Sequence, residues 1–414
     1  MKQAELQHRF IPFRKSDLVK MCIQHKSVDV NADDFQQFCA MLSHVFHYEF
    51  MESLERLKSA YQSMDPDIDT RTVFPHQDSS TEDFVPQLKR VLNEANYESI
   101  SMAELNQAMS RSSLFKLRLH VDFEDFSEIL LFYRGESKRR QTIKQWFGLR
   151  KQEIEFTNYD RVVVYIRYKQ DYQPEKGELE RGKAGATMLK LFQNVPKADL
   201  EMLFPNTALR MRTIDKLMIG VPALVSGGIV VSTKLGATLL LLASLFGFWL
   251  GLSKEPVELN AANLTILFAG LGALGGYAWK QFSNIKNRKL SFMQQLTQNL
   301  YFKNLDNNAG VFHRLLDEAE EEECKEAILA YFFLLSSNEP MDRPQLDAKI
   351  EEWLKQHWQC TMDFEIDDAM AKLIKLGIVQ QEPQGSQRYN ALPLRHAMAK
   401  LDERWDNYFT ITLN

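Results

Sequence analysis

The feature that most constrains this chain is the region 217–280, because it holds the only apolar runs long enough to cross a lipid bilayer. Its first run, 217–252, is far longer than one helix needs to cross a hydrocarbon core of ~30 Å, so it must be interrupted. Pro222 and the pair Gly227 and Gly228 are the natural breaks. We therefore expect two transmembrane helices, at 229–252 and 261–279, joined by a tight turn.

Basic residues flank this region on both sides, and by the positive-inside rule both flanks then face the cytoplasm or an equivalent compartment. These residues are Arg210, Arg212 and Lys216 before the spans and Lys280, Lys286, Arg288 and Lys289 after them. The turn instead combines Lys254 with Glu255 and Glu258. Two crossings satisfy this pattern. The alternative is three crossings, with 217–233 as a separate span, which would place the C-terminal part on the far side.

Small residues recur at every fourth position of both spans, namely Ala243, Gly247 and Gly251 in the first and Gly272 and Gly276 in the second. Such faces let helix backbones approach closely in lipid, so we expect these residues to pack the hairpin against itself. The alternatives are a dimer interface or a pore. Neither span contains an acidic residue, which argues against a proton relay or a cation pathway.

Residues 1–213, before the hairpin, are expected to form an α+β domain with a small antiparallel sheet. Apolar residues at helical spacing predict helices over 33–64, 81–95 and 101–109, and a Ser-x-x-Glu capping box at Ser101 and Glu104 opens the last. Alternating patterns predict strands at 114–121, 128–133 and 161–168. Residues 182–206 are expected to return to helix and turn.

Residues 281–414, after the hairpin region (214–280), are expected to form a helical, winged-helix-like domain, because three helical patterns precede two short strands. The third helix, 365–376, would be the recognition helix. It carries Glu365, Asp367 and Asp368 against Lys372 and Lys375, whereas contacts with phosphates need a basic surface. We therefore expect this domain to contact protein and not nucleic acid.

Charge and cysteine content narrow the choice further. The formal net charge of -5 argues against a globally basic nucleic-acid binder, and four scattered cysteines do not frame a zinc site or a disulfide-rich module. The N-terminus lacks the pattern of a secretory signal or a transit peptide. We expect reduced thiols facing a cytosol-like compartment, and insertion that depends on the internal hairpin.

Short motifs spread over 9–335 carry a family resemblance. They are RFIPF at 9–13, LFYRG at 131–135, LKLF at 189–192, DLEML at 199–203, NLDNNAG at 304–310 and DEAEEEE at 317–323. Together they resemble the transmembrane protein 143 family, uncharacterised two-span membrane proteins of the DUF3754 type from bacteria and eukaryotic organelles. The resemblance implies a membrane location and two spans, and it supplies no catalytic residues. Animal members are mitochondrial, but this chain lacks a presequence, so a bacterial inner membrane is expected, with a mitochondrial membrane as the alternative.

The segment 134–151 carries seven basic residues against Glu136 alone, with apolar residues between them. On a helix, Ile143, Trp146 and Phe147 share one face, which is typical of a segment that lies on an anionic membrane surface. The candidate lipid-contacting residues are Arg139, Arg140, Lys144, Trp146 and Phe147. The alternative is a basic connection between two strands.

Two further patterns have simpler alternatives. His313, Asp317, Glu321 (or Glu320) and Cys324 recur at steps of three and four, so they could ligate a divalent metal from one helical face, or simply form a solvated acidic helix. The stretch 177–184 nearly matches a phosphate-binding loop, but Ala184 stands where a hydroxyl must reach magnesium. We expect a solvent loop there, and neither a metal nor another cofactor.

These patterns favour a membrane-anchored scaffold or adaptor with both soluble domains on the cytoplasmic side. The chain has no GxSxG or HExxH motif, so nothing in it indicates an enzyme, although dispersed residues can assemble an unrecognised active site. The other alternative is a lipid-surface-sensing regulator that uses 134–151. The expected partners are the membrane, a protein or a second copy of the chain, and anionic lipid.

Overall fold

The computed structural model describes residues 8–25, 31–67, 69, 84–110, 118–145, 150–173, 183–210, 236–251, 260–337, 339–382 and 387–409. It contains both helices and antiparallel sheets, which confirms the expected α+β class. The chain divides into two compact units. Unit 1 comprises Met1–Ser112, Asp122–Leu200 and Lys303–Asn414, and unit 2 comprises Ser113–Val121 and Glu201–Phe302.

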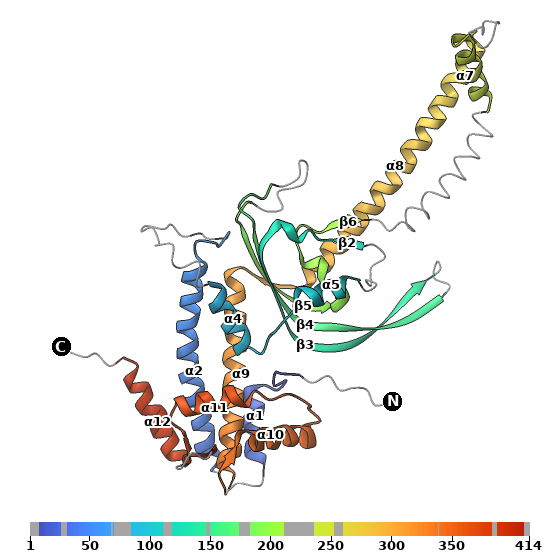
Figure 1. Ribbon diagram of the computed structural model, residues 1–414. Helices are drawn as coiled ribbons and strands as arrows, with labels where there is room; N and C mark the ends of the chain where they lie inside the picture. The colour runs from blue at the N-terminus through green and yellow to red at the C-terminus, as the bar shows by residue number, and fades with distance from the viewer. Residues whose placement is uncertain are drawn as a thin grey trace. The chain divides into compact units, whose positions relative to one another are not determined.

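Unit 1 contains a five-stranded antiparallel sheet with the order β1-β3-β4-β5-β7 (Figure 1). Its strands are β1 (Glu98–Ser99), β3 (Phe126–Gln145), β4 (Arg150–Tyr168), β5 (Thr187–Pro196) and β7 (Asn304–Asn307). The middle of β4 is β-branched and aromatic, and Val162 through Ile166 are all buried, as befits a strand covered on both faces. β7 pairs with β5, with Leu191 opposite Asp306, so the sheet joins segments from before and after the apolar region.

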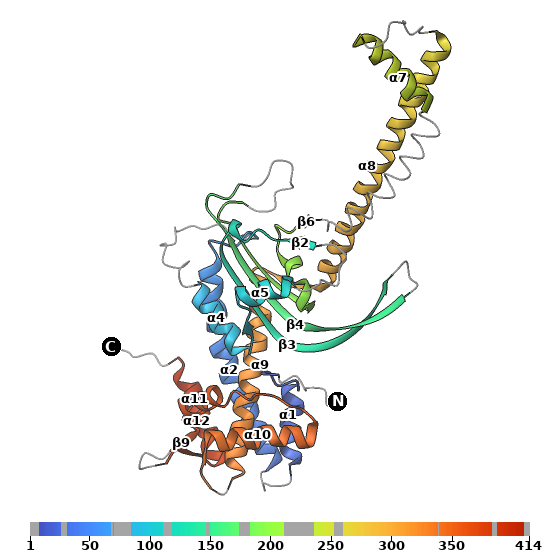
Figure 2. The same cartoon turned by 45° about the vertical axis from the view of Figure 1, so that its right-hand side comes forward.

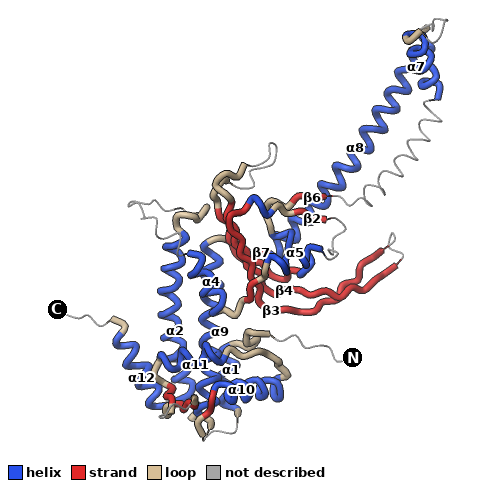
Figure 3. The backbone as a smooth tube through the Cα atoms, viewed as in Figure 1, coloured by secondary structure: helices blue, strands red, loops and turns tan. Residues whose placement is uncertain are grey.

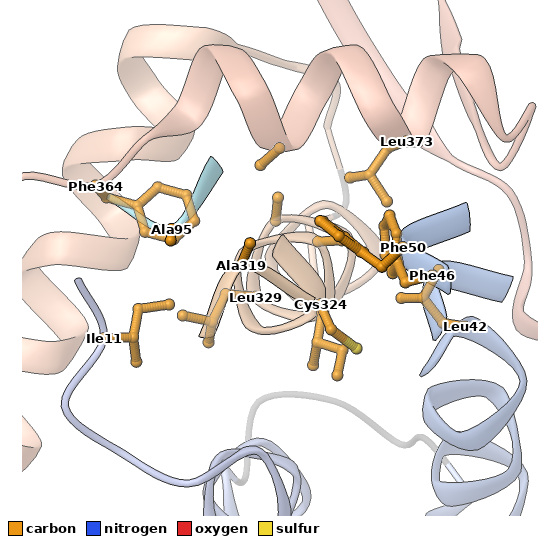
Figure 4. Close-up of a cluster of buried hydrophobic side chains, with 14 of the residues drawn as sticks. Ile11, Leu42, Phe46, Phe50, Ala95, Ala319, Cys324, Leu329, Phe364 and Leu373 are labelled. Carbon is orange, nitrogen blue, oxygen red and sulfur yellow. The ribbon is translucent and has the colours of Figure 1, made fainter. Parts of the chain in front are cut away.

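The long helices α2 (Ala32–Tyr61) and α9 (Ala309–Leu335) lie side by side at the centre of unit 1 (Figures 1 and 2). The shorter helices α1 (Lys15–Gln24) and α4 (Phe84–Glu94) also pack against α9. In Figure 4, Ile11, Phe46, Phe364 and Leu373 surround α9, and all of them belong to one hydrophobic cluster. The last turns of α9, residues 327–334, carry no charged residue and are buried on every side.

α9 and the elements after it follow the expected order of three helices, two short strands and a last helix, with one further short strand, β8, between α9 and α10. The elements after α9 are β8 (Met341–Asp342), α10 (Arg343–Trp358), α11 (Ile366–Lys375), β9 (Val379–Gln381), β10 (Arg388–Ala391) and α12 (Leu394–Asn407). The strands form an antiparallel sheet with the order β8-β10-β9, which together with α9, α10 and α11 gives the element order of a winged helix. The first turn of α10 has a reciprocal capping box between Asp342 and Gln345.

The division into units differs from the expected boundaries at 1–213, 214–280 and 281–414. One hydrophobic cluster contains Phe38 of α2, Leu88 of α4, Phe332 of α9 and Leu373 of α11. The reason is α9, which is the first helix of the winged-helix order and also the surface against which α1, α2 and α4 pack. Segments on both sides of the apolar region therefore share one core.

Unit 2 contains the paired strands β2 (Arg118–His120) and β6 (Ala208–Arg210), the helix α7 (Gly236–Trp249) and most of α8 (Ala261–Lys303). Within the described part of the chain, one helical stretch, Ala261–Asn284, is long and apolar enough to cross a membrane, and 6% of it is buried. Leu240–Trp249 is a shorter apolar helix. The expected first span, 229–252, lies partly outside the described residues, so the two-span hairpin stays a prediction.

One prediction of local structure is wrong, one of two alternatives for another segment is excluded, and one prediction is confirmed. The segment 182–206, expected as helix and turn, contains β5 and a 3-10 helix at Lys197–Leu203, because the buried positions of β5 largely alternate as in a strand. The segment 134–151 is not a surface helix, since β3 and β4 continue as a paired hairpin as far as Gln145 and Arg150 (Figure 3). The capping box is present, because Glu104 N–H donates to Ser101 Oγ and Ser101 N–H to Glu104 Oε2 at the start of α5 (Met102–Ser110).

Candidate functional site

The most unusual feature of unit 1 is a row of buried charged side chains on α9. They are Glu322, Glu323, Lys325 and Glu326, which are between 1% and 3% exposed. A buried ionised group costs several kcal/mol unless other groups neutralise it and hydrogen-bond to it, so the partners of these side chains define the site. The α9 charge network is the set Asn96, Arg134, Glu318, Glu322, Lys325 and Glu326.

Arg134 on β3 is the central cation of the network. Its Nη1 lies 2.9 Å from Glu318 Oε2, and its Nη2 donates to Glu322 Oε1 at 2.7 Å. The guanidinium also lies over the Phe10 ring, 4.7 Å from its centroid. Burial acts to lower the pKa of Arg134, but the two carboxylates outweigh it and the pKa is raised. This side chain therefore carries a permanent charge that fixes the sheet to α9.

Gly135 makes this approach of β3 possible. Its φ is 74°, a conformation that L side chains rarely adopt. A Cβ there would meet the Asp160 carboxylate and the Phe10 ring. The Arg-Gly pair therefore provides both the cation and the backbone geometry that places it.

The N-terminal segment 9–13 has no regular secondary structure, and charges of α9 hold its backbone. Ile11 N–H donates to Glu322 Oε2 at 2.9 Å. The Lys325 ammonium donates to the Ile11 carbonyl at 2.7 Å, the Phe13 carbonyl at 3.2 Å and Glu322 Oε1 at 2.6 Å. Backbone groups that would otherwise be buried without partners are satisfied in this way.

Asn96 extends the network to the end of α4. It has a φ of 57°, the left-handed conformation that Asn tolerates after a helix. Its Nδ2 donates to Glu326 Oε1 at 2.8 Å and to the Arg9 carbonyl at 2.9 Å. Burial raises the pKa of Glu326 well above its ordinary value, which favours the neutral form of this carboxyl.

The network joins segments that are far apart in the sequence, because its charged groups bond to one another and to the backbone of the N-terminal segment. It brings together three of the motifs that carry the family resemblance, at 9–13, 131–135 and 317–323. From the sequence alone we predicted no role for Arg134, Glu322, Lys325 or Glu326. The signal that could have found them is a run of acidic residues and Lys325 on a helix whose neighbouring turns are apolar.

A pocket of about 390 Å³ lies between α2, α4, α11 and α12 in the same unit. Its lining is mostly charged, with an apolar part from α2. The lining residues are Phe46, Glu49, Phe50, Glu52, Ser53, Arg56, Arg90, Glu94, Lys372, Lys375, Arg404 and Tyr408. Five of these side chains are basic and three are acidic, so the lining has a formal charge of +2.

Glu49 is the central acid of the pocket and ties α2 to the C-terminal helices. It accepts hydrogen bonds from Arg404 Nη2 at 2.6 Å, Lys375 Nζ at 3.1 Å and the Tyr408 hydroxyl at 3.1 Å. Burial acts to raise the pKa of Glu49, but the bonds from Arg404 and Lys375 outweigh it and lower the pKa. Glu49 is therefore ionised at neutral pH.

Lys372 on α11 connects the pocket with α9. Its ammonium pairs with Glu323 and lies 3.4 Å from Asp368, and its side chain is 20% exposed. Burial lowers the pKa of Lys372 to about 8, although Glu94 acts to raise it. Both lysines of α11, the helix expected to be the recognition helix, thus pair with acidic residues of unit 1.

The structure does not bring the four candidate metal ligands together. His313 and Asp317 are exposed, whereas Cys324 is fully buried and lies 3.2 Å from Ser43 Oγ. Glu321 lies 3.9 Å from Lys325 Nζ. Among the described residues no group of three or more metal-ligating side chains is found. The four cysteines are buried free thiols.

The candidate lipid-contacting residues lie on or beyond the hairpin of β3 and β4. Arg139 donates to Asn194 Oδ1 at 2.6 Å and Arg140 lies 3.3 Å from Glu155. As neighbours on a strand they point to opposite faces, so they do not share the single surface that a helix would give them. Trp146, Phe147 and the side chain of Lys144 lie outside the described residues.

The small residues of the spans are not where α7 and α8 come closest in the described part of unit 2. A Cβ at Gly247, Gly251, Gly272 or Gly276 would meet nothing within 4 Å, and Ala243 is exposed. Gly270, which the spacing pattern omitted, lies directly against Thr238. Thr238 Oγ1 donates to the Ile266 carbonyl at 3.1 Å, so a polar contact accompanies this approach. The loop resembling a phosphate-binding motif lies mostly outside the described residues.

Comparison with known proteins finds a similarity to one family of unknown function and indicates no activity. Residues 159–310 match the model of a family described as a protein of unknown function, DUF3754. The match runs from the middle of β4 to the start of α9, and so includes β5, α8 and β7. No solved structure matches the chain. Over 159–310 the protein is therefore similar to this uncharacterised family, which agrees with the DUF3754 type expected from its motifs, and the transmembrane protein 143 assignment stays a prediction.

Proposed function

We propose that the protein is an integral membrane protein of the transmembrane protein 143 type, held by a two-span hairpin at 214–280. In this proposal both soluble segments lie on the cytoplasmic side of a bacterial inner membrane, or on the equivalent side of an organelle membrane. Together they act as a scaffold or adaptor. The alternatives are a lipid-sensing regulator and an unrecognised enzyme.

The single observation that carries this proposal is the shared core of unit 1. β5 pairs with β7, Arg134 pairs with Glu322, and the Tyr61 hydroxyl donates to Asn308 Oδ1 at 3.1 Å, each contact joining a residue before the apolar region to one after it. Residues that share one folded core must lie on the same side of a membrane. The chain between them must then cross an even number of times, which favours two spans over three.

The surface of α8 supports a membrane location. The core helix of a soluble protein can match a membrane span in length and composition, but it is mostly buried. In contrast, only 6% of Ala261–Asn284 is buried. Its exposed apolar side chains include Phe268 at 67% and Trp279 at 71%. An exposed apolar helix of this length needs lipid or a partner to cover it.

The arrangement of unit 1 favours a scaffold. The acidic residues of the charge network bind the N-terminal segment and the sheet to α9. Helices α9 and α12 pack against α2. A winged helix that reads DNA needs a basic recognition helix, whereas Asp367 on α11 is 81% exposed. We therefore infer protein contact for this part of the chain.

Accessibility of single cysteines tests the topology. The native thiols are buried, so background labelling is low. Lys20→Cys and Arg395→Cys place a thiol at exposed positions before and after the hairpin, since their side chains are 68% and 86% exposed. Both should react with a membrane-impermeable maleimide only after permeabilisation of cells. Lys254→Cys, in the expected turn, should react before it. Labelling of only one of the first two in intact cells would refute the two-span proposal.

Crosslinking in cells tests the scaffold. A dominant protein partner captured by the full-length chain supports an adaptor, and loss of that partner on deletion of 394–414 would locate the contact. Capture of lipid alone would instead support the regulator. For that alternative, double charge reversal at Arg139 and Arg140 should weaken binding to anionic vesicles, whereas charge reversal at the 86% exposed Arg395 should not.

A further inference from the structure

We propose that the pocket between α2, α4, α11 and α12 binds the phosphate group of a small ligand. The inference is independent of the membrane anchor, because all the residues involved lie in unit 1. Its basis is the convergence of basic side chains from four helices on one concave site, with an apolar wall on one side.

The basic side chains come from segments far apart in the sequence. α2 supplies Arg56, α4 supplies Arg90, α11 supplies Lys372 and Lys375, and α12 supplies Arg404. Their convergence requires the core of unit 1 to be folded, so the site exists only in the complete unit. Guanidinium and ammonium groups that point into one space are the usual partners of a phosphate, which accepts bonds from several directions.

These side chains retain donors for a ligand. Arg90 is bonded to Glu94 through Nε at 2.8 Å, so this bond does not use its two terminal amino groups. The ion pair of Arg56 with Glu52 is an exposed pair, and such surface pairs contribute little to stability. The side chain of Lys375 is 62% exposed. A phosphate can therefore engage these groups while their surface ion pairs rearrange at small cost.

The acidic residues of the lining limit the kind of anion that fits. Glu49, Glu52 and Glu94 leave a formal charge of only +2, which suits one phosphate better than a polymer of phosphates such as DNA. Glu49 is already held by Arg404, Lys375 and Tyr408 and is fixed at one side of the site.

The size and the apolar wall of the pocket indicate an organic ligand. A volume of about 390 Å³ lies at the lower end of the range for small-molecule sites, and it is far larger than a phosphate alone needs. Phe46 and Phe50 line it from α2. The ligand class is therefore a phosphorylated small molecule with an apolar part. It can be a soluble metabolite or the headgroup of a lipid.

The test is binding to the purified full-length protein in detergent, measured by calorimetry. The probes used in detergent are inorganic phosphate, pyrophosphate and a short-chain water-soluble phosphatidic acid. After detergent removal, the vesicle probe is neutral lipid with and without phosphatidic acid. The test variant is Arg90→Gln, and the matched control is Arg395→Gln on α12, whose side chain is 86% exposed and does not line the pocket. Each variant replaces an exposed arginine by a polar side chain, so both proteins should fold normally.

Loss of a charge-assisted bond should weaken binding about tenfold or more in Arg90→Gln and leave Arg395→Gln unchanged. Glu94→Gln should tighten binding several-fold, because it removes a repelling charge beside the same arginine. Binding of inorganic phosphate or pyrophosphate with this pattern supports a metabolite, and the pattern with phosphatidic acid alone, in soluble form or in vesicles, supports a lipid headgroup. No saturable binding of any probe, or equal effects of Arg90→Gln and Arg395→Gln, would overturn the proposal.

Discussion

Replacement of Arg134 by methionine gives the sharpest test of the α9 charge network. Methionine fills the volume of the arginine stem but leaves Glu322, which is 1% exposed, with one cation fewer. Removing one partner of a buried ion pair costs about 3–5 kcal/mol. Glu322 keeps Lys325 at 2.6 Å and the Ile11 amide at 2.9 Å, so we expect a loss near the lower limit, about 3 kcal/mol.

The assay is equilibrium unfolding of the full-length protein in urea, in detergent, followed by tryptophan fluorescence. Trp353 is 6% exposed in the core and reports on unit 1. The matched control is Arg140→Met on the same strand, whose cation is 64% exposed and pairs with Glu155, so its loss should cost about 1 kcal/mol or less.

A double-mutant cycle separates the ion pair from simple loss of packing. If the two charges act together, Arg134→Met combined with Glu322→Gln should be less damaging than the sum of the single changes, by about 0.5–3 kcal/mol. Strict additivity, or a cost of Arg134→Met no greater than that of Arg140→Met, would refute the account of the network.

Three further predictions concern pH, backbone conformation and capping. Folding raises the pKa of Glu326, so above pH 4.5 the folded protein keeps a proton on this carboxyl that the unfolded chain releases. The free energy of unfolding therefore decreases as the pH rises above 4.5. Glu326→Gln should make this decrease smaller in urea titrations at several pH values. Asn308 has a φ of 47° yet bonds to Tyr61 and Asp67, so Asn308→Gly should lower stability by about 1–3 kcal/mol although it relieves the backbone; a gain would contradict this. Asp342→Ala removes the capping box of α10 and should cost about 1 kcal/mol, with faster amide exchange confined to its first turn.

The sequence was sufficient for those parts of the fold that depend on local pattern. The helices α2, α5 and α11 and the order of three helices and two strands follow from apolar spacing, capping residues and turns. Long-range pairing was missed where polar residues hide the strand alternation. The basic part of β3 has Lys138, Arg139 and Arg140 in a row, and their exposure on a hairpin allows a composition that does not alternate.

The site was less predictable than the fold, for physical reasons. The pocket takes its lining from α2, α4, α11 and α12, and no local pattern says that Glu49 and Arg404 meet. The charge network is visible in the sequence only as an acidic run, which ordinarily marks a solvated helix. In this protein the acidic run is not solvated, because Glu322 and Glu326 lie inside the core.

The most direct test of the central claim, one core built from segments before and after the apolar region, is crosslinking in intact cells. His47 on α2 comes before the apolar region in the sequence and Glu320 on α9 comes after it. Their side chains are 2.8 Å apart in unit 1. The full-length chain carrying His47→Cys and Glu320→Cys should form an intrachain link with a short bifunctional maleimide before detergent is added, detected as one crosslinked peptide pair. Absence of that link while both thiols react singly with maleimide, or reaction of the two thiols from opposite sides of the membrane, would contradict the account.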